Sequence, residues 1–198
     1  MMKQLIFASN NAHKLTEVKS ILSSNFSIVG LKDLNFNEEL AEDGNSFEEN
    51  ALQKAKFIQD KFNVSCFAED AGLEVFDLNM APGIYSARYA GLDRSDINNN
   101  ALLLENLEGK TDRRARFKAV IALCNANKYW FFEGVVNGTI ALSSSGNNGF
   151  GYDPIFIPDG YDKSFAELGS DVKNEISHRA KALVKLKEFL FHDKESLL

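Results

Sequence analysis

The sequence predicts an α/β domain built on a mixed β-sheet. Segments with helical periodicity alternate along the chain with short apolar or alternating segments that are typical of strands. Two such strands, predicted over 114–124 and 129–136, are separated only by Asn125-Ala126-Asn127, which predicts a hairpin and therefore an antiparallel pair. With 198 residues and no internal repeat, we expect a single domain, 1–198, or two closely joined lobes.

The first part of the chain predicts a strand and two helices. Leu5–Ala8 is a short apolar run that indicates a buried strand, and Leu15, Val18 and Leu22 then recur at helical spacing. A second helix opens with Ser46-Phe47-Glu48-Glu49, the pattern of a capping box in which the serine and the second glutamate bond each other's backbone N–H groups. In this second helix the apolar residues recur at helical spacing, which predicts one apolar face made of Phe47, Ala51, Ala55, Ile58 and Phe62.

Two further strands are predicted on either side of an acidic tetrapeptide. Val64–Ala68 and Leu73–Phe76 are apolar, and Glu69-Asp70-Ala71-Gly72 between them predicts a break. Ser95 is expected to cap a helix that ends near Leu107. The other predicted elements are a Ser/Asn/Gly-rich loop at 143–151, a short strand at Ile155–Ile157 and a last helix that starts at Ser177.

Composition and charge exclude several classes of function. A formal net charge of −6 argues against a nucleic-acid polymer as partner, because that partner needs a basic face. Apolar runs such as Val120–Cys124 are too short to cross a bilayer, and no cleavage-site pattern follows Leu5–Ala8, so neither a membrane span nor a secretion signal is expected. Cys66 and Cys124 are expected to be buried thiols in a reducing cytoplasm, with a disulfide as the alternative.

The first candidate for chemistry is Ser9-Asn10-Asn11-Ala12-His13-Lys14, between the first strand and the first helix. Helix N-termini attract anions, and Lys14 in the first turn opposes the helix dipole unless a negative group lies beside it. This pattern indicates either a phosphate site or an ordinary polar turn with a solvated lysine. It is not a Walker loop, because the chain contains no GxxxxGK[ST].

The second candidate is the acidic tetrapeptide Glu69–Gly72. Carboxylates at the end of a strand suit magnesium, which needs one or two of them together with substrate phosphates. The alternative is a hairpin turn, where Asp and Gly are common. The loop that contains Glu38, Glu39, Glu42 and Asp43 is also acidic, and such loops more often face solvent than bind metal.

Two candidates lie in the last third of the chain. The loop 146–154 carries three glycines that permit close backbone approach, and Phe150 and Tyr152 offer flat rings for a base, or else belong to an ordinary turn with core aromatics. Lys173–Arg179 places two cations and His178 near a helix start, where the histidine could equally close the helix end. His192 is expected to be solvated.

Taken together, these segments resemble the inosine triphosphate pyrophosphatase family, the pyrophosphatases of non-canonical purine nucleoside triphosphates. The resemblance spans nearly the whole chain, and its motifs occur in the family's order. They are Ser9–Lys14, Phe-x-Glu-Asn-Ala at Phe47–Ala51, the acidic motif at Asp70–Gly72, Ala-Pro-Gly-Ile-Tyr-Ser-Ala-Arg-Tyr at Ala81–Tyr89, Gly-Phe-Gly-Tyr-Asp-Pro-Ile-Phe at Gly149–Phe156, and Ser-His-Arg at Ser177–Arg179.

The resemblance implies an elongated fold of two lobes around a long mixed sheet, with a central nucleotide-binding cleft, and a homodimer. It implies that Asp70 is the catalytic carboxylate and a magnesium ligand, with Glu42 as a second ligand. Ser9, Asn11, Lys14 and Lys173 would hold phosphates, Phe150 would stack on the base, and Asp153, His178 and Arg179 would read its edge. The full set of implied substrate contacts is Ser9, Asn10, Asn11, Ala12, His13, Lys14, Ala71, Phe150, Gly151, Tyr152, Asp153, Lys173, His178 and Arg179.

Two positions depart from the family pattern: Glu69 replaces the first Asp and keeps its charge, and Ala71 replaces the serine. The family's motif is commonly Asp-Asp-Ser-Gly, and Ala71 here lacks the serine hydroxyl, which would weaken substrate binding by roughly 1 kcal/mol. The expected reaction is attack of water on the α-phosphorus with release of pyrophosphate. Two other functions stay open, a septum-inhibitor-type pyrophosphatase acting on other nucleoside triphosphates and a nucleotide-sensing module without turnover. An assay for pyrophosphate release separates the three.

Overall fold

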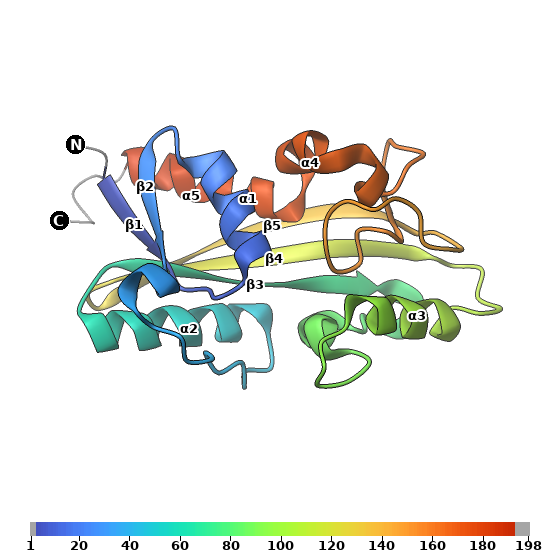
Figure 1. Cartoon of the computed structure of the whole chain (residues 1–198), viewed down its shortest axis with the longest axis horizontal. Coiled ribbons are helices and arrows are strands. Elements are labelled where there is room, and N and C mark those ends of the chain that lie inside the picture. The colour runs from blue at the N-terminus through green and yellow to red at the C-terminus, as the bar shows by residue number, and fades with distance from the viewer. Residues whose placement is uncertain (1–2, 193–198) are drawn as a thin grey trace. The chain divides into compact units, whose positions relative to one another are not determined.

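A computed structural model describes residues 3–192 and shows a mixed α/β fold (Figure 1). Six strands form one sheet in the order β2-β1-β3-β4-β5-β6; β1 pairs in parallel with β2 and β3, and β5 pairs antiparallel with β6. The mixed sheet predicted from the sequence is therefore confirmed. The strands are β1 Lys3–Phe7, β2 Phe26–Gly30, β3 Cys66–Val75, β4 Arg114–Asn125, β5 Lys128–Ile140 and β6 Phe156–Pro158. The helices are α1 Ala12–Leu22, α2 Phe47–Phe62, α3 Asp96–Asn106, α4 Phe165–Ile176 and α5 His178–His192.

The chain divides into two compact units. The first comprises the residues up to Asp70, Ala119–Gly134 and those from Ala180 on, and the second comprises Ala71–Lys118 and Val135–Arg179. Strands β3, β4 and β5 each contribute residues to both units. The division therefore falls within strands, and in β3 it falls directly after Asp70.

The core of the first unit lies between its strands and α2. Ala51, Ala55 and Ile58 form the buried face of α2 and pack against strand residues such as Ala68 and Ala122. This is the helical face that the spacing in the sequence predicts. Figure 1 shows α2 on one side of these strands and α1 and α5 on the other. The middle of β4 is accordingly buried on both faces, as expected where helices cover both sides of a strand.

The core of the second unit is rich in aromatic rings. Phe117 of β4 and Phe156 of β6 have ring centroids 4.7 Å apart, and Phe165 at the start of α4 stacks on Phe156 at 5.5 Å. Leu103 of α3 is fully buried in the same cluster. The rings bury large apolar areas and fix the geometry of this unit, in which the loop after β5 carries several of the predicted site residues.

The predicted break at Glu69–Gly72 is wrong, because β3 runs continuously from Cys66 to Val75. Asp and Gly are depleted in strands, which is why the tetrapeptide resembles a turn. Here Glu69 and Asp70 stay in the strand because the charged groups of Lys14 and Lys54 lie against them. Neutralising partners allow carboxylates to remain buried in a position where apolar residues would be expected.

Strand β2 and helix α4 are not predicted by the sequence pattern. In β2 only five residues, Phe26–Gly30, are extended, too few for a clear alternation to be recognised. Within α4, Gly169 has φ 80° and ψ 176°, so the helical repeat is interrupted halfway. Lys173 lies in the last turn of α4 and not at a helix start, so the predicted placement of this cation is wrong.

Half of the predicted capping box at α2 is present. The Ser46 hydroxyl accepts a hydrogen bond from the Glu49 N–H at 3.1 Å, as predicted. The Glu49 carboxylate, however, accepts from the N–H of Asn45 at 2.7 Å, one residue before the cap. Glu49 therefore fastens the loop that enters the helix, and this loop contains Glu42.

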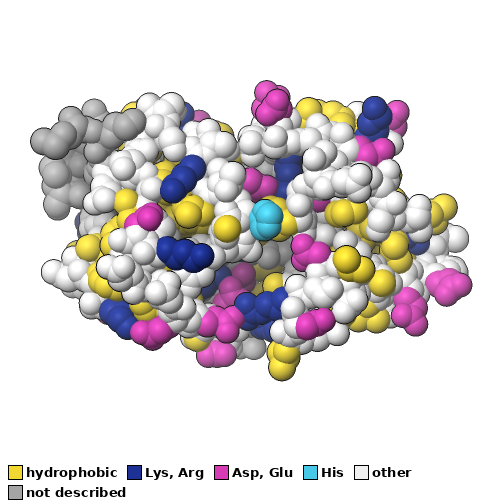
Figure 2. All heavy atoms as spheres, viewed as in Figure 1, with side chains coloured by type: hydrophobic (Ala, Val, Ile, Leu, Met, Phe, Trp, Pro, Cys, Tyr) yellow, Lys and Arg dark blue, Asp and Glu magenta, His cyan; other side chains and the backbone are white. Residues whose placement is uncertain are grey.

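The remaining expectations concern thiols, charge and membranes. Cys66 and Cys124 are both buried and free, as predicted. Between residues 3 and 192, no helix is long and apolar enough to cross a bilayer. Acidic and basic side chains are interspersed over the face drawn in Figure 2, and His192 is exposed as expected. Met1 and Met2, at the start of the segment in which no secretion signal is predicted, lie outside the described residues.

Candidate active site

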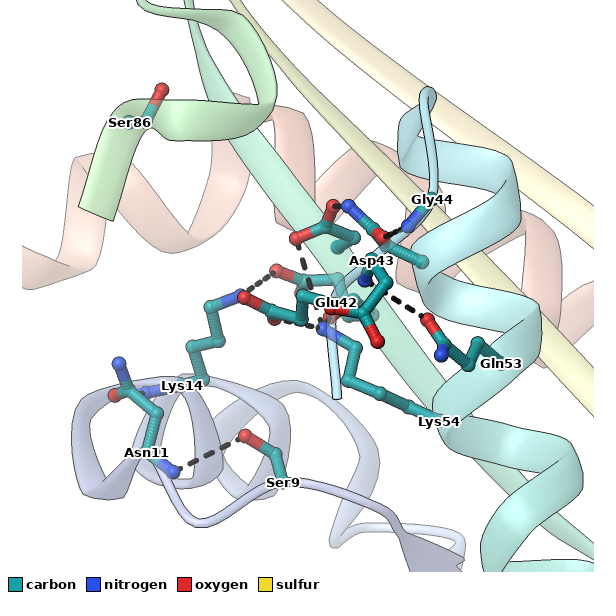
Figure 3. Close-up of polar contacts among 12 residues, drawn as sticks. Ser9, Asn11, Lys14, Glu42, Asp43, Gly44, Gln53, Lys54 and Ser86 are labelled. Atoms are coloured by element: carbon teal, nitrogen blue, oxygen red, sulfur yellow. Dashed lines mark hydrogen bonds and ion pairs between the residues drawn. The ribbon is translucent and has the colours of Figure 1, made fainter. Parts of the chain in front are cut away.

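A cluster of buried charges in the first unit surrounds the ammonium group of Lys54. Its Nζ lies 2.5 Å from Glu42 Oε1, 2.9 Å from the carbonyl oxygen of Glu69 and 3.7 Å from Asp70 Oδ1. The Lys54 and Asp70 side chains are only 7% and 8% exposed. Figure 3 shows Lys54 reaching from α2 toward Glu42. The loop, α2 and β3 thus bring together oxygen atoms that are far apart in the sequence.

Lys14 approaches the same carboxylates from α1 (Figure 3). Its Nζ lies 3.3 Å from Glu69 Oε1, and the Glu69 side chain is fully buried. The negative group that the helix dipole requires beside Lys14 is therefore a carboxylate of the chain itself. With Lys54, Glu42 and Asp70, this pair makes a group of two cations and three carboxylates, an excess of one negative charge when all are ionised.

Burial shifts the acidity of Asp70. Desolvation raises the pKa of its carboxyl above the ordinary value of 3.8; Lys54 and Lys14 lower it, the charge of Glu42 raises it, and a hydrogen bond from Asn50 lowers it. Desolvation outweighs the two cations in this balance. A carboxylate whose pKa lies above its ordinary value is a better proton acceptor near neutral pH than an exposed aspartate.

The donor set around Lys54 fits magnesium. Glu42, Asp70 and the Glu69 carbonyl supply hard oxygen atoms that already converge on one positive charge. Among the described residues, no group of three or more His, Cys, Asp or Glu side chains could hold a metal by itself. Two carboxylates are nevertheless sufficient for magnesium when substrate phosphates complete its coordination.

The turn that precedes α1 has well-defined side-chain contacts. Asn11 is the N-cap, and its Oδ1 accepts from the Lys14 N–H at 3.0 Å, while its own N–H donates to Ser9 Oγ at 3.2 Å. Asn10 Nδ2 donates to the carbonyl of Glu38 at 2.8 Å. Asn10, Asn11, Ala12 and His13 are exposed, and Ser9 and Lys14 are half-buried. Acidic side chains are absent from the first turn of α1, so this helix end presents its positive dipole to an anion.

In the second unit, Phe150 is half-buried beneath two cations. Lys173 Nζ lies 4.3 Å and the Arg179 guanidinium carbon 5.6 Å from the centre of its ring. Lys173 Nζ also donates to Asp153 Oδ2 at 2.6 Å, and the Phe150 N–H donates to the same oxygen at 2.9 Å. Lys173 is only 4% exposed, so the structure groups it with the predicted base-binding residues of this unit.

The loop before Asp153 requires glycine at position 149. Gly149 has φ +82°, and a Cβ there would lie 2.2 Å from Asp153 Oδ2. The Tyr152 ring lies in the core of the unit, with its hydroxyl donating to the Ser86 carbonyl at 2.9 Å. The ring of Tyr152 therefore packs in the core and does not offer the flat surface for a base that the sequence suggested.

His178 and Arg179 begin α5 as buried side chains. The His178 ring stacks on Phe117, with centroids 4.8 Å apart and planes at 11°, and Arg179 is 2% exposed. Both belong to the unit that contains Phe150 and Asp153. The structure therefore brings together the residues predicted to read a base, whereas those predicted to hold phosphates are divided, with Lys173 in the second unit and the others in the first.

Four polar residues that contact predicted site residues, two in each unit, are not predicted by the sequence. Lys54 and Asn50 of α2 contact Asp70, while Asp96 and Asn100 of α3 bind the backbone of Gly151. Lys54 had a recognisable signal, because it interrupts the apolar face of α2 one turn before Ile58. The two α3 residues had none, since their partner is a backbone group distant in sequence.

The chain is thus a mixed α/β protein with one group of charged residues in each of its two units. A model of the Ham1 family matches residues 5–189. The chain therefore belongs to the Ham1 family, and the resemblance found in its motifs is confirmed.

Similar proteins support this membership over nearly the full length. A dITP/XTP pyrophosphatase of Porphyromonas gingivalis is 47% identical over 96% of this chain and 98% of its own length. One of Clostridium perfringens is 48% identical, with coverage of 96% and 98%. The solved structure of the Staphylococcus aureus Ham1 protein has a TM-score of 0.87 at 43% identity and covers 96% of this chain and 98% of that one.

The raised pKa of Asp70 gives a prediction about stability. Folding disfavours the ionised carboxylate, so the contribution of Asp70 to stability is present below pH 3.8 and is lost as the pH rises through its folded-state pKa. We expect the free energy of unfolding of Asp70→Asn to exceed that of the parent at about pH 7.5. This difference between the two proteins should narrow toward about pH 4. Urea unfolding followed by circular dichroism at several pH values measures both variants.

Asp112 provides a control of opposite sign. Hydrogen bonds from exposed Arg114 lower the pKa of Asp112 to about 2. Asp112→Asn should therefore show no gain of stability as the pH rises. An Asp70→Asn variant whose stability followed that of Asp112→Asn at every pH would contradict the role of desolvation at Asp70.

Proposed function

We propose that this chain hydrolyses non-canonical purine nucleoside triphosphates (ITP, dITP and XTP) to the monophosphate and pyrophosphate. The observation that carries the proposal is the buried cluster at Asp70, in which a carboxylate with a raised pKa lies among cations and hard oxygen donors. Relatives that match over nearly the full length carry the name dITP/XTP pyrophosphatase, and a carboxylate placed to take a proton from water suits hydrolysis of a triphosphate. In the cell, this reaction would remove nucleoside triphosphates that carry a wrong base from the nucleotide pool.

The first unit would supply the chemistry at the triphosphate. Lys14 and the N-terminus of α1, with Ser9 and Asn11, form a positive surface for phosphate oxygens. Asp70 would orient a water molecule toward the α-phosphorus and take its proton, while the bond from that phosphorus to the oxygen of the leaving pyrophosphate breaks. Glu42 and Asp70 would hold magnesium, which supplies neutralisation of the charge that develops on the phosphates.

The second unit would recognise the base. Phe150 offers one half-buried ring face for stacking, and the cations Lys173 and Arg179 lie against that ring. Arg179 carries only donors, which match the oxygen at C6 of hypoxanthine and xanthine but not the amino group of adenine. Asp153 is hydrogen-bonded to Lys173 and to the backbone of its own loop, so its orientation is set before a base arrives.

The two alternative functions differ in their products. A septum-inhibitor-type enzyme would prefer other nucleoside triphosphates, and a sensing module would release no pyrophosphate. A panel of nucleoside triphosphates with magnesium, scored for both monophosphate and pyrophosphate, tests the proposal directly. Turnover of pyrimidine triphosphates above ITP and XTP would contradict it, as would binding without turnover.

Assembly and compartment belong to the same proposal. A homodimer is proposed from the family resemblance, and exposed apolar side chains of the second unit, such as Leu92 at 89% and Ile97 at 81%, would be available to its interface. The two buried thiols favour the cytoplasm, where reducing conditions preserve them. Light scattering of the purified chain measures its oligomeric state.

Replacement of Asp70 should remove most of the activity. If its carboxylate both accepts the proton and holds the metal, Asp70→Asn should lower kcat about 10²- to 10⁴-fold, equivalent to about 3 to 5 kcal/mol of barrier. Steady-state assays on dITP measure the change, and excess EDTA should abolish the activity of the parent. Near-parental turnover in the variant would remove Asp70 from the mechanism.

The position of bond cleavage is a separate prediction. Attack on the α-phosphorus in ¹⁸O-water should place the label in the nucleoside monophosphate, because the oxygen of water becomes bonded to that phosphorus. Mass spectrometry of both products measures the distribution. Label in pyrophosphate, or formation of a nucleoside diphosphate, would indicate attack at another phosphorus.

Base selectivity should depend on Arg179, and the stacking of any base should depend on Phe150. A site that leaves a buried charge facing the wrong partner rejects it by about 10⁴-fold, so the ITP-to-ATP ratio of kcat/KM should narrow in Arg179→Ala. Phe150→Ala should weaken all substrates together, because stacking tolerates any base. Comparison of kcat/KM for ITP, XTP, GTP and ATP tests both variants. An unchanged ratio in Arg179→Ala would assign base reading to another residue.

A further inference from the structure

We propose that Asn50 is a positioning residue that fixes both acidic groups of the metal site, the carboxylate of Asp70 and the loop of Glu42. Asn50 lies in the first turns of α2 and is fully buried. Its side chain joins the loop before α2 to strand β3, as the ammonium group of Lys54 does through Glu42 and the Glu69 carbonyl. The inference rests on the proposed role of Asp70 and Glu42.

The orientation of the Asn50 amide follows from its partners. Asn50 Oδ1 accepts from the backbone N–H of Gly44 at 2.8 Å, and a backbone N–H can only donate. The amide nitrogen must therefore face Asp70, and Nδ2 donates to Asp70 Oδ2 at 2.9 Å. Asn50 can offer Asp70 a donor and nothing else, which favours the ionised carboxylate at this position.

This contact determines which oxygen of Asp70 is presented to a cation. With Oδ2 bound to Asn50, the carboxylate plane is fixed and Oδ1 faces the Lys54 ammonium at 3.7 Å. Partners of this kind orient metal ligands and commonly affect metal affinity or activity by about 10- to 100-fold when they are removed. Asn50 would therefore act on the reaction through Asp70 without contacting the substrate.

The Oδ1 atom of Asn50 is one of three side-chain acceptors on α2 that bind the backbone of the acidic loop before the helix. The N–H groups of Asp43, Gly44 and Asn45 donate in turn to Gln53 Oε1 at 3.2 Å, Asn50 Oδ1 at 2.8 Å and Glu49 Oε2 at 2.7 Å. Figure 3 shows Asp43 and Gly44 facing the α2 side chains in this way. Glu42 directly precedes these three residues, so side chains of α2 fix the backbone that carries it.

Gly44 makes the close approach to α2 possible. A Cβ at this position would lie 2.6 Å from the Cβ of Glu49 and 2.9 Å from Asn50 Oδ1, distances that side chains do not adopt. The loop therefore packs directly on the helix, and the Asn50 amide fills the space between the loop and β3. Asn50 thus combines its bond to the loop with a bond to Asp70 Oδ2.

The test replaces Asn50 with leucine, which keeps the volume and removes both hydrogen bonds. We expect kcat for dITP to fall about 10- to 100-fold with KM within about threefold of the parent. Binding of Mn²⁺ alone, measured by electron paramagnetic resonance, should weaken about tenfold. Binding of ITP in EDTA should be unchanged, because Asn50 contacts neither the predicted phosphate site nor the base site.

Asn99 supplies the matched control. It is 2% exposed, and its amide also bonds two backbone groups, accepting from Ala90 N–H at 2.7 Å and donating to the Ala87 carbonyl at 3.3 Å. Asn99→Leu should destabilise the fold comparably and leave kcat and Mn²⁺ binding near the parental values. If Asn50→Leu behaves like Asn99→Leu in both measurements, the positioning role is overturned.

A second variant separates the two ends of the amide. Asn50→Asp can still accept from Gly44 but places a carboxylate against Asp70, so the inference expects a loss of kcat at least as large as in the leucine variant. Parental activity in Asn50→Asp would overturn the contact with Asp70. Failure of the proposed function is distinguishable, because the parent would then release no pyrophosphate from dITP, whereas weaker Mn²⁺ binding in Asn50→Leu would still report the positioning role.

Discussion

The burial of the Lys54 ammonium against three oxygen acceptors is the interaction on which the rest of the first unit depends. An unpaired ammonium or carboxylate in this position would be strongly destabilising, by several kcal/mol per ion. The arrangement is tolerated because Glu42, the Glu69 carbonyl and Asp70 share the one cation. It allows β3 to continue through two acidic residues, and it keeps carboxylate oxygens close together where a divalent cation would be bound.

In each unit, helix side chains bind the backbone of a loop that carries predicted site residues. Side chains of α2 accept from three consecutive N–H groups of the loop after Glu42. In the second unit, Asp96 of α3 accepts from the Gly151 N–H at 2.6 Å, and Asn100, one helical turn later, donates to the Gly151 carbonyl at 3.0 Å. A helix is more rigid than a loop, so both sets of site residues acquire a fixed backbone before any ligand binds.

The sequence predicts elements better than it predicts partners. The apolar face of α2 and the hairpin that joins β4 and β5 follow from local periodicity and turn length, and the motifs identify the family. The continuity of β3 could not be predicted, because it depends on Lys14 and Lys54, which arrive from other helices. For the same reason the contact between Asn50 and Asp70 has no local signature, although both residues lie within the recognised motifs.

Asp70 indicates why a site of this kind resists prediction from folding rules. Its pKa is raised, so ionisation of this side chain opposes folding at neutral pH, whereas an apolar residue in the middle of a buried strand would not. Folding alone gives no reason for a carboxylate there. A proton acceptor, however, gains from desolvation, since a pKa nearer to the working pH makes it a stronger base. In the role proposed for Asp70, the local loss of stability and the catalytic advantage would have one physical cause, because Lys54, Lys14 and Asn50 lower the pKa of the carboxyl without outweighing its desolvation.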